Sequence, residues 1–290
     1  RGTYESLLLR SALTTMKHFR CSACSAALLL GILLLFTACS HATRLTATSG
    51  NGQGEYDVYL LIGQSNMAGR GTLLPTDTLQ PLEGVWLLNA EGQPEPAVAP
   101  LNKYSTIRKQ LSMQQAGPGN SFGPAMHRHS GRKILLVVNA RGGSSIRSWM
   151  PGAKDGYLEQ AVRRTRQALH YGPLRGILWH QGESDARHCT HYMEQLQEMV
   201  AALRRQLGAG NVPFVAGEIA RWLPERKAFN PIIRTIDQHI PNSSWVSSRG
   251  CQALADPSDP HFSRDGQRRL GLRYAEKMQQ MQARQLHTPQ

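Results

Sequence analysis

The segment YLLIGQSNMAGRG, residues 59–71, is the starting point for predicting the fold. Its first four residues, 59–62, are aromatic or aliphatic and predict the end of a buried strand. The next four, GQSN at 63–66, carry small or hydrogen-bonding side chains. A turn explains the glycine, but it does not require two amides around a serine. The segment therefore predicts either a plain turn or a nucleophile, Ser65, at the carboxyl end of a strand, and the rest of the sequence has to separate these alternatives.

Strand-like and helix-like patterns alternate over the remainder of the chain. Apolar or β-branched runs predict strands at 56–62, 85–88, 133–139, 176–179, 212–216 and 245–247. Amphipathic or capped segments predict helices at 122–130, 157–170, 190–207 and 263–284. This alternation predicts one α/β domain in which helices cover both faces of a parallel sheet.

Four local features refine this prediction. Pro124 is expected in the first turn of the helix at 122–130, where proline is tolerated. Ser263 is expected to cap the last helix. The weak strand at 85–88 is expected to form a hairpin with the Pro-rich stretch that follows it. The segment 91–120 has no clear period and predicts a long surface loop, of the kind that often has a function.

Polar, glycine-rich clusters follow four of the predicted strands. GQSN follows the first strand, ARGGSS (140–145) follows ILLVVN, HQGESD (180–185) follows GILW, and GE (217–218) follows VPFVA. In parallel α/β sheets, sites form at the carboxyl ends of the strands. Turns alone do not need glutamine, histidine and carboxylates at these points, so the clusters favour a functional site at this edge of the sheet.

A histidine beside two carboxylates lies just ahead of the last helix, in DPSDPHFSRDG at 256–266. Asp259 precedes His261 by two residues, and Pro260 between them favours extended backbone at Asp259. The carboxylate can orient the imidazole only if this loop bends. The free ring nitrogen would then take the proton of Ser65. Asp256 is the alternative carboxylate, and a plain surface loop is the alternative interpretation.

Four motifs in this order resemble the SGNH-hydrolase superfamily. IGQSNM, GGSSIRSW, WHQGESD and DPHFS are most similar to its carbohydrate-esterase branch, the sialate O-acetylesterase and acetylxylan esterase (family 6-like) relatives. The resemblance covers roughly residues 55–280. It implies a flavodoxin-like, three-layer α/β/α fold and a serine esterase that hydrolyses O-acetyl esters on carbohydrates through a Ser-His-Asp acyl-enzyme mechanism. It implies no metal and no organic cofactor.

The resemblance assigns catalytic roles position by position. Ser65 is the nucleophile and His261 the general base. Asp259 is the acid, although relatives often carry it three residues before the histidine, where this chain has Ser258. The implied oxyanion hole consists of the Ser65 backbone N–H, Gly123 at a helix start, and the side chain of Gln181. Gly142 and Gly143 are alternatives for the glycine.

The remaining polar residues of the motifs are expected to support the site. Gln64, Asn66 and Glu183 are interpreted as supports of the site loops, and His180 as a loop residue rather than a second base. Trp149 and Trp179 are expected to line the pocket or to pack in the core. Ser144 and Ser145 are expected to contact sugar hydroxyls or to finish a turn.

The first 38 residues resemble a bacterial export signal. Basic residues follow Met16, an apolar run extends over 26–36, and Thr37-Ala38-Cys39 resembles a lipobox. We therefore divide the chain into an upstream extension with a lipoprotein signal peptide (1–38), a flexible tether rich in Ser, Thr and Gly (39–54), and the esterase domain (55–290). The prediction is an exported protein lipidated at Cys39 and anchored to the bacterial cell envelope. An ordinary cleaved signal is the alternative.

The formal net charge of +13 is spread over the chain without a run of five basic residues. We interpret it as a solvated basic surface that weakly favours an acidic glycan. The expected partner is an acetylated carbohydrate, with membrane contact only through the lipid anchor and no nucleic acid. The sequence indicates neither the particular sugar nor an oligomeric state.

Two cysteines, Cys189 and Cys251, lie in the predicted domain. A disulfide between them and a pair of free thiols are both compatible with an exported protein. No CxxC pair with the spacing of zinc ligands occurs after Cys39, so a structural metal site is not predicted.

Two other functions remain alternatives. One is a sugar-binding lipoprotein of the same fold without turnover, which would be free to lose a residue of the set Ser65, His261 and Asp259. The other is a basic anchor or nucleic-acid-binding protein, which would be indifferent to Ser65→Ala.

Overall fold

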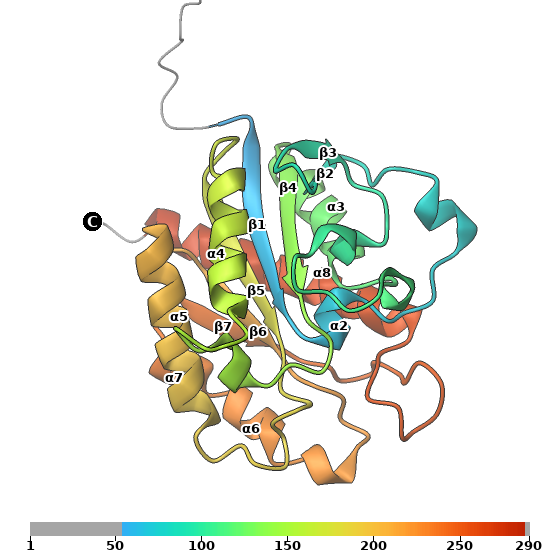
Figure 1. Cartoon of the computed structure of the whole chain (residues 1–290), viewed down its shortest axis with the longest axis vertical. Coiled ribbons are helices and arrows are strands. Elements are labelled where there is room, and N and C mark those ends of the chain that lie inside the picture. The colour runs from blue at the N-terminus through green and yellow to red at the C-terminus, as the bar shows by residue number, and fades with distance from the viewer. Residues whose placement is uncertain (1–53, 288–290) are drawn as a thin grey trace, which may run out of the picture. The chain divides into compact units, whose positions relative to one another are not determined.

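One sheet of seven strands forms the centre of residues 54–287, the part of the chain that the computed structural model describes (Figure 1). The predicted signal, Cys39 and nearly all of the predicted tether lie outside these residues. The strands are β1 (Tyr56–Gly63), β2 (Val85–Leu88), β3 (Pro94–Pro96), β4 (Lys133–Ala140), β5 (Leu174–His180), β6 (Phe214–Gly217) and β7 (Ser243–Val246).

The strand order is β3-β2-β4-β1-β5-β6-β7. Strands β2 and β3 pair antiparallel, as the hairpin prediction required, and the other neighbours pair parallel. After β1 the chain forms β2, β3 and β4 on one side of that strand and then crosses to β5 on the other side. The run β4-β1-β5-β6-β7 therefore has the flavodoxin-like order, with a topological switch point at β1. The predicted α/β fold class is confirmed.

Helices cover both faces of the sheet. The helix α3 (Gly119–Ser130) packs with α8 (Arg264–His287) on one face, and α4 (Tyr157–Ala168) packs with α5 (Tyr192–Leu207) on the other. Figure 1 shows α4 and α5 in front of the strands and α8 behind them. None of the helices within the described range has the length and apolar composition of a membrane span.

The central strand explains the two-sided core. Its residues alternate between two hydrophobic clusters: Val58, Leu60 and Ile62 pack with α4 and α5, whereas Tyr59 and Leu61 pack with α3 and α8. Successive side chains of a strand point to opposite faces, so a strand buried on both faces must be apolar throughout. This is why the run before GQSN has no polar alternation.

Several predicted boundaries need correction. The helix α3 begins at Gly119, so Pro124 lies inside it and not in its first turn. The short helices α2 (Ser65–Ala68), α6 (Phe229–Ile233) and α7 (Ile236–His239) were not predicted, because each is too short for its period to show in the sequence. The predicted cap of α8 is confirmed: the Gly266 N–H donates to the Ser263 hydroxyl over 3.2 Å.

The segment 91–120 is not simply a surface loop. Asn102 is only 1 % exposed. Its side chain exchanges two hydrogen bonds with the backbone of Ala140 at the end of β4, over 3.0 and 3.1 Å, and donates to Gln114 over 2.8 Å. The segment is therefore docked onto the carboxyl end of the sheet, close to the polar clusters.

The two cysteines of the domain are both free thiols. Cys251 is buried, with its sulfur 3.6 Å from the Gly266 carbonyl oxygen. Cys189 is half-buried beside the core that contains α5. No disulfide between Cys189 and Cys251 therefore links the loops that carry them.

Candidate active site

The serine of GQSN lies where β1 ends and α2 begins. Gly63 has a φ of +136°, and a Cβ there would lie 2.1 Å from the carbonyl oxygen of His180. Only glycine permits this close approach of β1 to β5. The next residue, Gln64, donates its N–H to the same carbonyl over 2.8 Å. The backbone then turns and places Ser65, 6 % exposed, at the carboxyl edge of the sheet.

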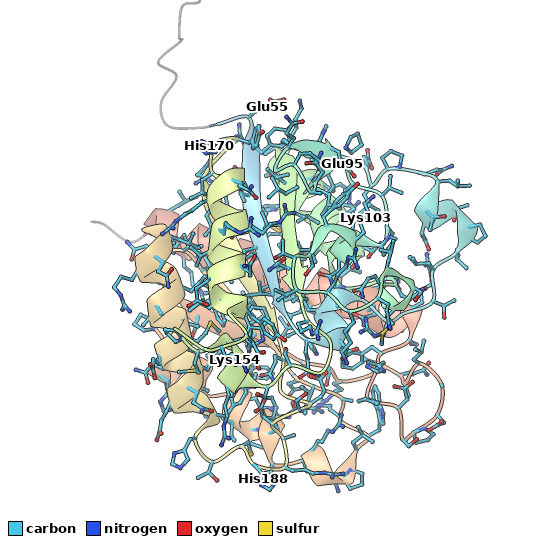
Figure 2. All side chains as sticks on the ribbon, viewed as in Figure 1. Glu55, Glu95, Lys103, Lys154, His170 and His188 are labelled. Carbon is cyan, nitrogen blue, oxygen red and sulfur yellow. The ribbon has the colours of Figure 1, made fainter. Side chains whose placement is uncertain are left out.

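All the predicted clusters meet at this edge. Figure 2 shows Glu55, which precedes β1, at one end of the molecule and His188, in the loop after β5, at the other. Because the neighbouring strands are parallel, the segments after β1, β4, β5 and β6 all emerge at the second end. The loop before α8 reaches the same end, which brings residues of distant sequence together.

Ser65, His261 and Asp259 form a hydrogen-bonded chain. The Nε2 of His261 lies 3.0 Å from the Ser65 Oγ, and the Nδ1 lies 2.8 Å from an Asp259 carboxylate oxygen. That same oxygen accepts the backbone N–H of His261 over 2.8 Å. The loop therefore bends as the sequence argument required. Asp256 is not the partner, since its exposed carboxylate binds the Ser258 hydroxyl and N–H instead.

The charge state of His261 suits a proton acceptor. Burial lowers its pKa below the ordinary value, the Asp259 carboxylate opposes this effect, and the Arg70 guanidinium adds to it. The imidazole is therefore neutral at neutral pH. With Nδ1–H donating to Asp259, Nε2 is left to accept from the Ser65 hydroxyl.

Asn66 joins the serine loop to the histidine loop. Its Nδ2 donates to Glu183 over 2.5 Å and to the Pro260 carbonyl over 3.1 Å. Its Oδ1 accepts the Phe262 N–H and the Gln267 amide, each over 3.1 Å. Because Pro260 and Phe262 flank His261, this side chain fixes the imidazole relative to the serine.

Glu183 and His180 are buried beneath this connection. Desolvation raises the pKa of Glu183, while the hydrogen bond from Asn66 lowers it in part. Among the described residues the Glu183 Oε2 has no hydrogen-bond partner. Burial lowers the pKa of His180 to about 3, and its Nδ1 bonds Tyr274 over 3.0 Å. His180 is thus a neutral, buried residue that ends β5, and not the loop residue that was predicted; its burial does not suit a second base.

Gln181 is not placed as an oxyanion donor. It is fully buried, and its Nε2 lies within hydrogen-bonding distance of Gln64, Ser144 and Asp185 oxygens. Its Oε1 accepts the Tyr192 hydroxyl over 2.7 Å. The amide nitrogen has only two hydrogens, and these three acceptors leave neither of them free for an oxyanion. The prediction from the resemblance is therefore corrected: Gln181 supports the loop.

Gly123 is also displaced from its predicted role. It lies within α3, where an added Cβ would be 2.9 Å from Val85 in the core. Gly142 takes the position beside the serine instead, since a Cβ there would lie 3.6 Å from the Ser65 Cβ. Among the described residues the backbone N–H groups of Ser65 and Gly142 donate to no acceptor. Gly142, one of the two alternatives to Gly123 in the oxyanion hole, therefore has the better geometry for this role.

A pocket of about 270 Å³, called here the site pocket, opens over Ser65 and His261. Its lining includes Gly142, Gly143 and Gln64, and the Gln64 Nε2 has no acceptor among the described residues. Three cationic side chains line it as well: Arg70, Lys109 and Arg226. Sequence reasoning missed these three, although Lys109 belongs to the segment 91–120 that was predicted to be functional.

Other predicted candidates lie outside the site pocket. Trp149 and Trp179 are fully buried in the core, and their rings stack edge-to-face. The Ser144 hydroxyl accepts the Trp149 indole N–H over 3.0 Å and so finishes the turn. Between residues 54 and 287 no three His, Cys, Asp or Glu side chains converge as metal ligands would.

Comparison with known proteins agrees with this geometry. Residues 55–280 match the model of a family described as carbohydrate esterase, sialic acid-specific acetylesterase. A probable carbohydrate esterase of Arabidopsis thaliana is 26 % identical over 242 residues, which are 76 % of this chain and 88 % of that protein.

Solved structures resemble the same region. The X-ray structure of the Arabidopsis protein has a TM-score of 0.69 at 24 % identity and covers 78 % of this chain and 98 % of its own. A carbohydrate acetylesterase from Xanthomonas citri has a TM-score of 0.53 at 19 % identity and covers 76 % of this chain and 55 % of its own. At these identities the likeness supports the fold, and the family model supports the family. The chain belongs to the sialic acid-specific acetylesterase family of carbohydrate esterases.

Proposed function

We propose that this protein is a serine esterase that removes O-acetyl groups from carbohydrates through an acyl-enzyme. The observation that carries the proposal is the chain of hydrogen bonds from Ser65 through His261 to Asp259 at the floor of an open pocket. Family membership makes an esterase the expected activity. The restriction to acetyl esters of sugars is our proposal.

The reaction proceeds in two steps. The Ser65 oxygen attacks the ester carbonyl while His261 Nε2 takes the hydroxyl proton, and the same proton leaves with the sugar alcohol. Water then attacks the acetyl carbon on Ser65 while His261 accepts a proton from that water. The bond from this carbon to the Ser65 oxygen breaks, His261 gives its proton to that oxygen, and acetic acid departs and ionises to acetate. Asp259 holds the ring and stabilises the imidazolium that forms in each step.

The oxyanion that forms in each step needs fixed donors. We assign this role to the backbone N–H groups of Ser65 and Gly142, which have no competing acceptor among the described residues. A Cβ built at Gly142 would lie 3.6 Å from the Ser65 Cβ, so the two residues are neighbours. The amide of Gln64 on the pocket wall is the third donor in this proposal. Donors of this kind are worth about 3 kcal/mol each in comparable hydrolases.

Acetate release tests the proposal. The full-length protein is incubated with acetylated xylan, O-acetylated sialic acid and p-nitrophenyl acetate, beside Ser65→Ala, His261→Ala and, as matched control, Ser112→Ala in the exposed turn at 111–113. We expect hydrolysis by wild type and Ser112→Ala, and at least a thousandfold loss in the two site variants. Equal rates in wild type and Ser65→Ala would overturn the proposal and leave the sugar-binding alternative.

We also propose export and lipid anchoring at Cys39, which lies outside the described residues. The proposal rests on the order of basic residues, apolar run and lipobox-like segment in the sequence. Metabolic labelling with a fatty acid in a bacterial host should mark the wild type and not Cys39→Ser. Labelling of both would place the acyl chain elsewhere.

A further inference from the structure

Two further hollows with cationic walls lie beside the site pocket. The first has a volume of about 340 Å³, and the second about 480 Å³. Six cationic residues line them: Arg221, Arg226, Lys227, Arg234, Arg249 and Arg273. They come from the segments after β6 and β7 and from α8, and Figure 1 shows α6, beside this region, at the end of the sheet where α2 begins.

The three hollows adjoin one another, because neighbouring hollows share lining side chains. Arg226 lines both the site pocket and the first hollow. Arg221, Arg234 and Arg249 line both the first hollow and the second. The hollows therefore follow one another outward from Ser65, each with cationic side chains in its wall and each within or near the size range of small-molecule sites.

A buried carboxylate holds two of the arginines in place. Glu218 is fully buried, and it accepts two hydrogen bonds from Arg221, over 2.9 and 3.2 Å, and one from Arg234 over 2.6 Å. Burial alone would raise the pKa of Glu218, but these bonds and the Ser248 N–H lower it below the ordinary value. Both guanidinium groups are thus fixed on their inner edges, while their side chains remain 31 and 38 % exposed.

The outer edges of these groups are available to a ligand. Among the side chains that the structure describes, Arg221 Nη1 and both Nη atoms of Arg234 have no acceptor. Arg249 and Lys227 are exposed and likewise have no side-chain partner within that set. Preorganised guanidinium forks bind carboxylates with two parallel hydrogen bonds.

We infer that the two hollows are subsites for an anionic polysaccharide, which carries carboxylates at intervals along the chain and extends from the site pocket. This inference rests on the proposed function, because the polymer must also present an acetyl ester to Ser65. The shared wall with the site pocket favours a polysaccharide over nucleic acid or a membrane, neither of which needs to lie next to the nucleophile. The hollows then select the polymer, and Ser65 acts on its ester.

Binding without turnover tests the inference separately from catalysis. Affinity electrophoresis measures the full-length protein against de-esterified polygalacturonate and against neutral xylan. Lys227→Gln/Arg249→Gln is compared with Arg163→Gln/Arg205→Gln, which removes the same charge from exposed positions on α4 and α5. We expect the first pair to weaken polygalacturonate binding about tenfold, and the control pair less than twofold, at low salt. Equal effects of the two pairs would overturn the inference.

Two further arms identify the ligand class. If a DNA duplex or vesicles of anionic phospholipid bind as tightly as polygalacturonate and lose as much in Lys227→Gln/Arg249→Gln, the surface is a general anion site and the inference is wrong. With O-acetylated polygalacturonate as substrate, the KM relative to that of p-nitrophenyl acetate should rise about tenfold in the same variant, with kcat retained. Binding that persists in a protein without turnover would contradict only the proposed esterase function.

Discussion

At the scale of single residues, we expect different effects on kcat from substitution of the two carboxylates near His261. Asp259 bonds the imidazole, whereas the Asp256 carboxylate accepts hydrogen bonds from the N–H and hydroxyl of Ser258. We expect Asp259→Asn to lower kcat by about a hundredfold to ten-thousandfold, because an amide no longer holds the correct tautomer or stabilises the imidazolium. Asp256→Asn, three residues earlier in the chain, should keep the wild-type rate. Acetate-release kinetics on both variants decide the assignment, which is wrong if Asp256→Asn suffers the larger loss.

The pKa of His261 predicts the acid limb of the pH profile. Burial and Arg70 lower this pKa, and Asp259 raises it. Because only the neutral imidazole accepts a proton, kcat/KM should be constant at neutral pH and fall as the pH drops through a value below 6.5. Arg70→Gln removes a positive charge and should move that limb to higher pH. A shift to lower pH would contradict this account of the site charges.

Glu183 links protonation to stability. Its pKa in the folded state is raised above the ordinary value of 4.5. A carboxyl group of this kind stabilises the fold less as the pH rises from about 4.5 through its folded pKa. Glu183→Gln keeps an acceptor for Asn66 without the buried charge. The free energy of unfolding of this variant minus that of wild type, measured by urea titration, should therefore increase from acid to neutral pH. A difference that does not change with pH would contradict this explanation.

At the scale of elements, a substitution at Gly142 tests whether the loop after β4 contributes to the oxyanion hole. A Cβ at this position would lie 2.6 Å from an Arg70 nitrogen and 3.6 Å from the Ser65 Cβ. We expect Gly142→Ala to lower kcat at least about tenfold by crowding the oxyanion position. The control is Gly210→Ala, where an added Cβ meets nothing within 4 Å and φ is not positive. Equal activities of the two variants would remove Gly142 from the oxyanion hole.

The elements also show what the sequence could predict. The strands β1 and β4 are recognisable because both their faces are buried, which forces uninterrupted apolar runs. The polar residues after them could be assigned to one edge from chain direction alone. Gln181 and Gly123 could not be assigned correctly, because the direction of an amide and the rotation of a helix depend on packing: Tyr192 and Asp185 engage the first, and Val85 covers the second.

At the scale of the whole molecule, the site exists only when distant segments are joined. Ser65 and His261 are 196 residues apart and belong to the first strand end and to the loop before the last helix. The cationic walls were invisible in the sequence for the same reason, since Arg70, Lys109 and Arg226 come from three separate segments. Their spacing along the chain has no period, and only the folded sheet edge makes them neighbours.

This dependence predicts how activity is lost during unfolding. Trp149 and Trp179 are buried in the core, whereas Trp222 donates to the Asp259 carbonyl in the histidine loop. The measurement is therefore made in a Trp222→Phe background, where tryptophan fluorescence reports global unfolding. With Asn66 intact, its hydrogen bonds with Pro260 and Phe262 hold the histidine loop to the serine loop, and activity and fluorescence should therefore change at the same urea concentration. In Asn66→Ala these bonds are missing while the tryptophan core remains, so the histidine loop should detach first. Activity should then be lost at a clearly lower urea concentration than fluorescence. Coincident transitions in Asn66→Ala would mean that packing around α8, and not Asn66, holds His261 against Ser65.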